Sequence, residues 1–158
     1  MPFSDSYANN ILNYTFAKTQ QLTAHAQVWI GLSSNDPEVD GGTFDELSGG
    51  GYGRVIISLR GETYPNFINS ASDREITNSY QIAFPKATSE WTVNGIGLFS
   101  SQTGGEPFFY GAIELTEEQA EAGGLIVDPG AVALFDPQTF KIGFPATDIS
   151  TAAATAST

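Results

Sequence analysis

The fold of this chain is decided by the segment VWIGLSSNDP at residues 28–37 and by SGGGYGRV at residues 48–55. Val28, Ile30 and Leu32 alternate with other residues, which is the period of a β-strand that buries one face. The acidic residues and the triple glycine that follow are typical of loops and tight turns. The pattern therefore predicts a strand, an acidic loop, a glycine turn and a second strand, and it contains no obvious catalytic set.

The rest of the chain repeats this organisation, with short apolar stretches separated by Gly, Pro, Asn and Asp. Turn residues at short intervals, together with β-branched and aromatic residues between them, predict strands. Such a series favours a mainly β fold, specifically an antiparallel β-sandwich of jelly-roll-like type with a short N-terminal helix. The predicted strands cover residues 27–33, 54–59, 80–84, 91–100, 107–115, 124–127, 131–135 and 139–144.

Two segments have helical character. At residues 4–18, Tyr7, Ile11 and Tyr14 recur at helical spacing behind possible serine caps, which predicts the N-terminal helix. The Thr-Glu-Glu-Gln sequence that opens residues 116–122 is a capping-box pattern and predicts a second, very short helix. We expect one domain over residues 1–145, followed by an Ala/Thr-rich C-terminal tail at residues 146–158.

Charge excludes several classes of partner. The chain has 158 residues, 6 Lys and Arg against 18 Asp and Glu, and a net charge of −12. Nucleic acids and anionic membranes are bound through clustered basic residues, so we expect neither as a partner.

There is no Cys, which excludes disulfides and thiolate metal ligands. No segment has the length and apolarity of a membrane span, and no signal peptide is apparent, so synthesis in a cytoplasm is expected.

Two acidic clusters contain residue types that could form a chemical site. Residues 36–41 place carboxylates at alternating positions before a glycine, as in a calcium loop, but the twelfth position is Leu47 instead of Glu. A solvated hairpin loop is therefore favoured, and we expect no metal and no cofactor. Paired carboxylates of the glycosidase kind could come from one acidic stretch, although their separation after folding cannot be read from sequence. That stretch contains Glu114, Glu117, Glu118 and Glu121.

The order and spacing of several short motifs resemble a family of small phage virion proteins, many of which are described as tail fibre proteins. The resemblance covers residues 1–144 and departs from the family at the acidic insert of residues 116–123 and in the tail. It carries no catalytic residues, so it implies a non-enzymatic structural protein. The motifs lie at Asn10–Leu12, Val28–Leu32, Ser34–Pro37, Ser48–Arg54, Phe84–Thr88, Trp91–Phe99, Thr103–Gly105 and Phe109–Gly111.

The resemblance leads us to expect a virion location, and the acidity favours the exterior of the particle. Our first expectation is a capsid decoration or cement protein, homotrimeric, that binds the major capsid protein. The alternative is a tail-fibre or baseplate receptor-binding module, in contact with tail proteins, that stacks exposed aromatic residues on sugars. A carboxylate-dependent glycan hydrolase is a more distant third. Besides the C-terminal tail, the candidate contact residues are Tyr7, Ile11, Asp36, Glu38 and Asp40, and, for the receptor-binding reading, Tyr64, Phe67 and Phe108.

Overall fold

The computed structural model describes residues 5–12, 27–59 and 75–143, and within them the chain is mainly β with antiparallel pairing. This confirms the predicted class. The helices are α1 (Asp5–Leu12) and α2 (Glu117–Glu121). The strands are β1 (Gln27–Ser33), β2 (Val55–Leu59), β3 (Glu75–Thr77), β4 (Ile82–Ala83), β5 (Trp91–Val93), β6 (Gly95–Phe99), β7 (Phe109–Ala112), β8 (Leu125–Val127), β9 (Leu134–Phe135) and β10 (Lys141–Gly143).

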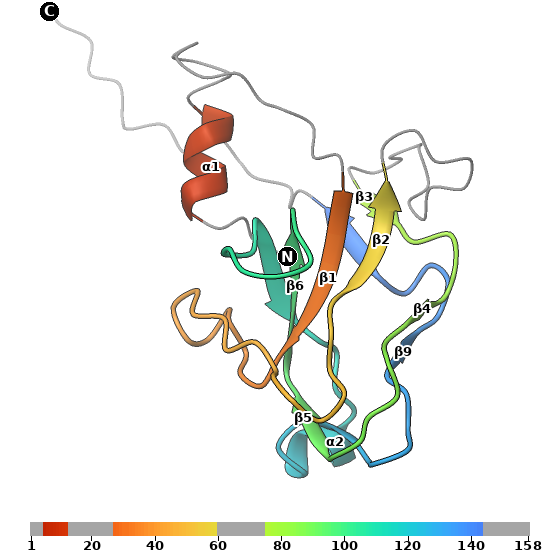
Figure 1. The fold of residues 1–158 in the computed structure, drawn as a ribbon. Helices are drawn as coiled ribbons and strands as arrows, with labels where there is room; N and C mark the ends of the chain where they lie inside the picture. The colour runs from red at the N-terminus through yellow and green to blue at the C-terminus, as the bar shows by residue number, and fades with distance from the viewer. Residues whose placement is uncertain (1–4, 13–26, 60–74, 144–158) are drawn as a thin grey trace, which may run out of the picture.

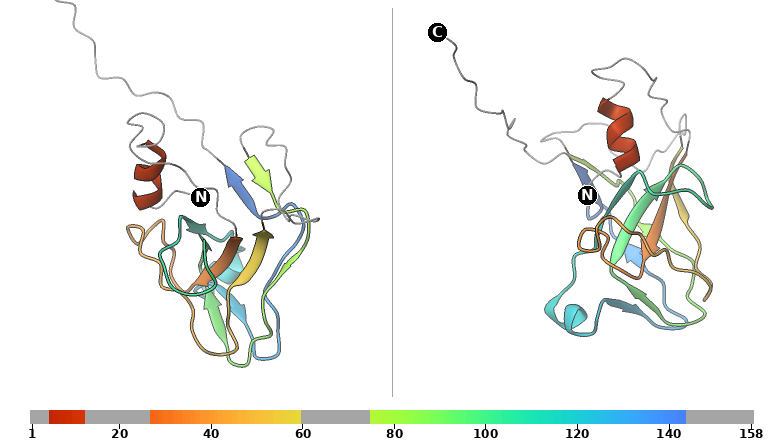
Figure 2. Two further views of the ribbon diagram at one scale, coloured as in Figure 1. Left: turned by 45° about the horizontal axis from the view of Figure 1, so that its top comes forward. Right: turned by 90° about the vertical axis from the view of Figure 1, so that its left-hand side faces the viewer.

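A four-stranded sheet with the order β2-β1-β6-β7 forms the centre of the fold. Three two-stranded ladders, β10-β3, β4-β9 and β5-β8, accompany it. The β5-β8 ladder lies with α2 at one end of the sheet, and β4 lies next to β2 (Figure 1). Figure 2 shows β3 and β10 side by side, away from α2. A complete sandwich of jelly-roll topology is not established by these ladders and stays a prediction.

The central strand β1 agrees with its predicted alternation and adds a second buried face. Ile30 and Leu32 have no exposed surface and enter the hydrophobic core. Gly31 and Ser33, on the opposite face, are buried as well. A Cβ atom on Gly31 would lie 2.9 Å from the Phe99 ring, so this face of the strand is covered too. The chain therefore needs glycine at position 31.

An ion pair between the buried Arg54 and the half-buried Glu46 explains the Tyr-Gly-Arg sequence that follows the glycine turn. The Arg54 guanidinium donates from Nε to Glu46 Oε1 and from NH2 to Glu46 Oε2, both at 2.6 Å. The Tyr52 hydroxyl donates to Glu46 Oε1 and accepts from the backbone N–H of Leu32, both at 2.9 Å. These bonds tie the end of the acidic loop to β1 and to the start of β2.

Arg54 also fixes the loop that follows β6. Its NH1 donates to the carbonyl oxygens of Ser101 and Gly104, both at 2.9 Å. The guanidinium carbon lies 3.3 Å from the centre of the Phe99 ring, in cation–π geometry. The side chain is only 3% exposed, so this one cation organises three segments in the interior.

The triple glycine forms the tight turn that its sequence predicts. Gly49, Gly50 and Gly51 all have positive φ angles, and the Tyr52 N–H closes the turn on the Gly49 carbonyl at 2.9 Å. The Gly50 carbonyl accepts the Trp91 indole N–H at 3.0 Å. A side chain on Gly50 would meet this indole, so the turn requires glycine for contact as well as for conformation.

Element boundaries differ from the predictions in instructive ways. The predicted strand at residues 91–100 is divided into β5 and β6 at Asn94, whose backbone bonds both Ser33 and Ile113. Strand β3 was not predicted, because three residues give too little periodicity. The predicted helix at residues 116–122 is present as α2, with both capping-box hydrogen bonds. Of the helix predicted at residues 4–18, α1 covers Asp5–Leu12 and residues 13–18 lie outside the described part.

Replacing Glu46 by Ala is expected to lower the free energy of unfolding by about 3–5 kcal/mol, because the buried Arg54 charge would lose its partner. Urea denaturation followed by tryptophan fluorescence measures the change. Glu106→Ala, at an exposed residue, is the matched control and should change stability little. A loss for Glu46→Ala no larger than that of the control would contradict the assigned role of the ion pair.

Stability is expected to fall as the pH rises above about 10. Burial, and then the neighbouring Glu46 carboxylate, raise the pKa of the Tyr52 hydroxyl above its ordinary value of 10.0. Because the folded pKa exceeds the unfolded one, the contribution is complete below pH 10 and is lost as the unfolded chain ionises first. Urea midpoints measured across this range should fall less steeply for Tyr52→Phe than for the wild type, and an equal slope would contradict the assigned role of the hydroxyl.

Candidate functional site

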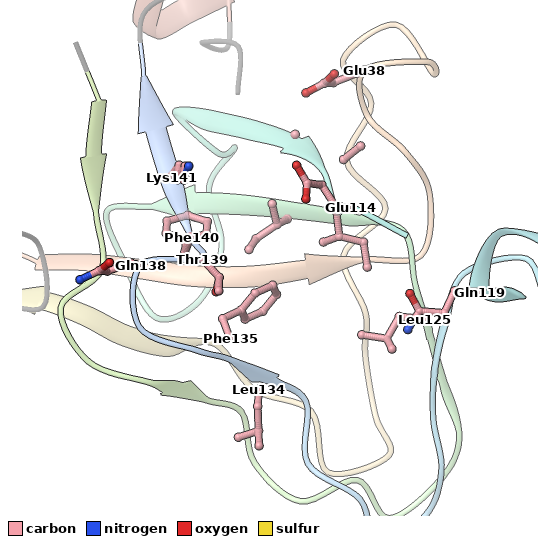
Figure 3. A pocket seen from close by; sticks show the side chains of 14 residues that line it. Glu38, Glu114, Gln119, Leu125, Leu134, Phe135, Gln138, Thr139, Phe140 and Lys141 are labelled. Carbon is pink, nitrogen blue, oxygen red and sulfur yellow. The ribbon is translucent and has the colours of Figure 1, made fainter. Parts of the chain in front are cut away.

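An open groove of about 690 Å³ lies between the β6–β7 side of the sheet and the segment that runs from β9 to β10. Figure 3 shows its labelled side chains, with Glu38 and Glu114 toward one side and Thr139, Phe140 and Lys141 toward the other. The volume is within the range of ligand pockets, roughly 300–1,000 Å³. The groove is lined by Glu38, Ile96, Gly111, Ala112, Ile113, Glu114, Gln119, Leu125, Leu134, Phe135, Gln138, Thr139, Phe140 and Lys141.

The sheet side of the groove comes from paired strands. Ile96 on β6 is buried and faces Gly111 of β7 in the register. Beyond Gly111, the chain continues along the groove through Ala112 and Ile113 to Glu114, and Ala112 and Glu114 are exposed. This side therefore offers an apolar base together with the backbone of a strand at the edge of the sheet.

The opposite side is held in place by a buried asparagine. Asn78 has no exposed surface, and its amide nitrogen donates to the carbonyls of Tyr80 and Asp136 at 2.8 and 2.9 Å. Its amide oxygen accepts the Phe140 N–H at 2.9 Å. Phe140 is buried and its ring makes an edge contact with Phe135. These bonds fix the turn between β9 and β10 and keep both rings at the groove.

Polar groups surround this apolar surface. Lys141 lies on the β10 side, and Glu38 and Glu114 bring carboxylates to the other side. Gln119 comes from α2, where its side-chain oxygen accepts the Thr116 N–H at 3.0 Å in the capping box. A groove with both apolar and hydrogen-bonding walls suits an occupant that has both kinds of surface.

The acidic loop that carries Glu38 is built by its own hydrogen bonds. Asp36 Oδ1 accepts the Glu38 N–H at 2.9 Å, as in an Asx turn. Asp40 Oδ2 accepts from the Asn35 side chain at 3.0 Å. Within residues 5–12, 27–59 and 75–143, no cluster of three or more potential metal ligands is formed. Two of the three predicted contact carboxylates thus have local structural bonds, while Glu38 reaches the groove.

Asn35 is the central residue of this loop. Its amide nitrogen donates to Thr43 O at 2.8 Å as well as to Asp40, and its amide oxygen accepts the Asp45 N–H at 3.0 Å. The Ser33 hydroxyl donates to the same amide oxygen. The loop is therefore shaped by one side chain that the sequence did not single out.

The remaining predicted contact residues are distributed over the molecule. Phe108 is half-buried, packs against the core and makes an edge contact with Phe109, so it is not the exposed loop-tip aromatic that was expected. Ile11 is half-buried in α1, the helix that also contains Tyr7. Tyr64 and Phe67 lie outside the described residues. Among the members of this set whose side chains the structure describes, Glu38 lines the groove.

Sequence reasoning missed most of the groove. Phe135, Gln138, Thr139 and Lys141 were assigned to strands and to a turn, with no binding role. Of the four glutamates considered for hydrolysis, Glu114 lines the groove, whereas Glu117, Glu118 and Glu121 belong to α2 and are exposed. A possible signal was the density of side chains with hydrogen-bonding or aromatic groups around Asp136-Pro137.

Comparison with known proteins identifies a family. A family model described as Podophage GP4 fiber I protein gp80 matches residues 2–134 of the chain. No curated protein matches it. The match confirms the resemblance to phage virion proteins of the tail-fibre type, and its description fits the tail-fibre alternative better than capsid decoration. In the described part of the chain, no helix is long and apolar enough to cross a membrane.

Replacing Asn35 by Ala is expected to destabilise the protein by about 2 kcal/mol, because several hydrogen bonds of the acidic loop are lost together.

Adding millimolar calcium should leave the thermal midpoint of the wild type unchanged, since Asp36 and Asp40 are engaged in loop bonds. Differential scanning calorimetry measures both effects. An increase of the midpoint with calcium but not with magnesium would show that the loop is a cation site after all.

Proposed function

Because the chain belongs to the phage fibre family described as Podophage GP4 fiber I protein gp80, we propose that it is a structural module of a tail fibre. The observation that carries the proposal is the family match, which extends over residues 2–134 and so includes most of the described fold. The match supports a fibre component of the virion. The position of the chain within the fibre and its partners are proposed below.

The proposed location replaces capsid decoration as the first reading. Decoration was favoured by the acidity of the chain and by its resemblance to virion proteins in general. A net charge of −12 suits an exposed fibre equally well, because both positions lie outside the DNA-filled shell. The family description therefore favours the tail.

The proposed role is non-enzymatic. A glycosidase needs two carboxyl groups at a defined separation, and one of them is kept protonated by an apolar environment. Glu38 and Glu114 line the same groove, but both side chains are exposed and come from a loop and from the segment after β7. A scaffold that positions neighbouring subunits accounts better for a fold whose interior polar groups are used in structural bonds.

We further propose that the module assembles with copies of itself, as a homotrimer, and with other tail proteins. Only 15% of the residues are charged, which leaves much uncharged polar surface that neighbouring subunits can cover. Phage fibres gain stability from such association because each added copy removes surface from water.

The location can be tested on intact particles. Gold-labelled antibodies against the purified chain should decorate the tail region in electron micrographs, and mass spectrometry should find far fewer copies than of the major capsid protein. Purified chain should also bind less to capsids that lack tails than to tailed particles from which the fibres were removed. Uniform labelling of the capsid, with a copy number approaching that of the shell protein, would instead support decoration.

A further inference from the structure

The strand at one edge of the central sheet has a side on which no described strand pairs. In the order β2-β1-β6-β7, β7 is the edge strand. The direction of its backbone groups follows from β1, where the Leu32 carbonyl accepts from Leu47 N at 3.0 Å and the Leu32 N–H donates to the Tyr52 hydroxyl. The backbone N–H and C=O of Leu32 therefore point away from β6. Its partner on β6, Ile96, consequently directs its backbone groups to β7.

Strand alternation then fixes the outward groups of β7. Gly111 is the partner of Ile96, so its N–H and C=O face β6. Ala112 follows it and points both backbone groups away from the sheet. The Ile113 N–H donates to Asn94 O at 3.1 Å, as this alternation requires. Among the described residues, no hydrogen bond reaches the outward backbone groups of Ala112, which lines the groove and is exposed.

The other side of the groove supplies a covering surface for an added strand. Phe135 and Phe140 place rings there, and Leu134 is 50% exposed. Strand addition combines backbone hydrogen bonds at a sheet edge with pockets for alternate side chains. The edge of β7 and the apolar surface across the groove provide both.

We propose that this groove binds, in extended form, the C-terminal segment of residues 144–158 from a second copy of the chain, as a strand added to β7. The inference builds on the self-association proposed above and assigns it a mechanism. It does not depend on where in the virion the protein is located.

The chain itself supports this choice of occupant. The segment reads FPATDISTAAATAST, with small side chains after Ile149 that fit beside phenylalanine rings. Its one charged residue, Asp148, is opposite in sign to Lys141 in the groove. Fully extended, a segment of this length spans roughly 50 Å, which is enough to reach a neighbouring subunit.

The same geometry favours a neighbour over the subunit's own segment. Strand β10 borders the groove at Lys141, across from β7, and pairs along its length with β3. A return into the same groove would need a reversal, whereas a segment from another copy can enter directly. When each subunit donates its C-terminal segment to the next subunit in the same direction, the assembly closes into a ring.

Engineered disulfides test the proposal cleanly because the chain has no cysteine of its own. Differently tagged chains carrying Glu114→Cys and Ala153→Cys are co-expressed, purified through both tags and oxidised. Mass spectrometry should find the link between positions 114 and 153 at least about tenfold above the control pair, because docking raises the effective concentration of the thiols. The control pair uses Glu90→Cys, at an exposed residue outside the groove, with Ala153→Cys.

A second variant addresses the backbone hydrogen bonds. Ala112→Pro removes the outward N–H and leaves the β6–β7 ladder intact, as an edge position permits. Light scattering after gel filtration should show smaller species for this variant. The control variant Ala112→Ser should keep the wild-type mass. The proposal is overturned if cross-chain links do not exceed the control, if a chain with both cysteines links only within itself, or if folded Ala112→Pro keeps the wild-type mass. An assembly that persists without the link would retain the proposed fibre role and reject only this mechanism.

Discussion

The structure depends on the ion pair between the buried Arg54 and the half-buried Glu46. A buried charge stabilises a fold only when it is paired and hydrogen-bonded. The guanidinium uses Nε and NH2 on the carboxylate, NH1 on two carbonyls and its face on Phe99. Tyr52 connects the same carboxylate to β1. These contacts hold the acidic loop, the glycine turn and the loop after β6 in fixed positions relative to one another. The acidic loop in turn brings Glu38 to the groove.

Much of the fold could be predicted from sequence because alternation and turn residues are local signals. Strand β1 has the predicted bounds, and the capping box of α2 is formed by the residues that suggested it. The two-residue strands β4 and β9 lie within longer predicted strands, because two residues carry no period of their own. Pairing partners such as Glu46 and Arg54 were not predicted, since an ion pair is recognised only after the intervening turn has brought its members together.

The groove was harder to predict for the same reason. Its residues range from Glu38 to Lys141, so its walls come from segments that are far apart in the sequence. The functional class was instead carried by the order of many weak motifs, which the family match over residues 2–134 confirmed. That match ends at the start of β9, so most of the β9–β10 side of the groove lies beyond the shared region.

The Arg54 contacts to the loop after β6 have a kinetic consequence. Ser101 and Gly104 lie 47 and 50 residues from Arg54 along the chain, so the guanidinium reaches them only after a long stretch has been brought together. Closing such a stretch costs entropy before any contact compensates for it, and folds rich in long-range pairing form slowly. We therefore expect the interior cation to be satisfied late, as the step that completes the native state. A newly made chain would thus remain incompletely structured around Arg54 until β6 has docked.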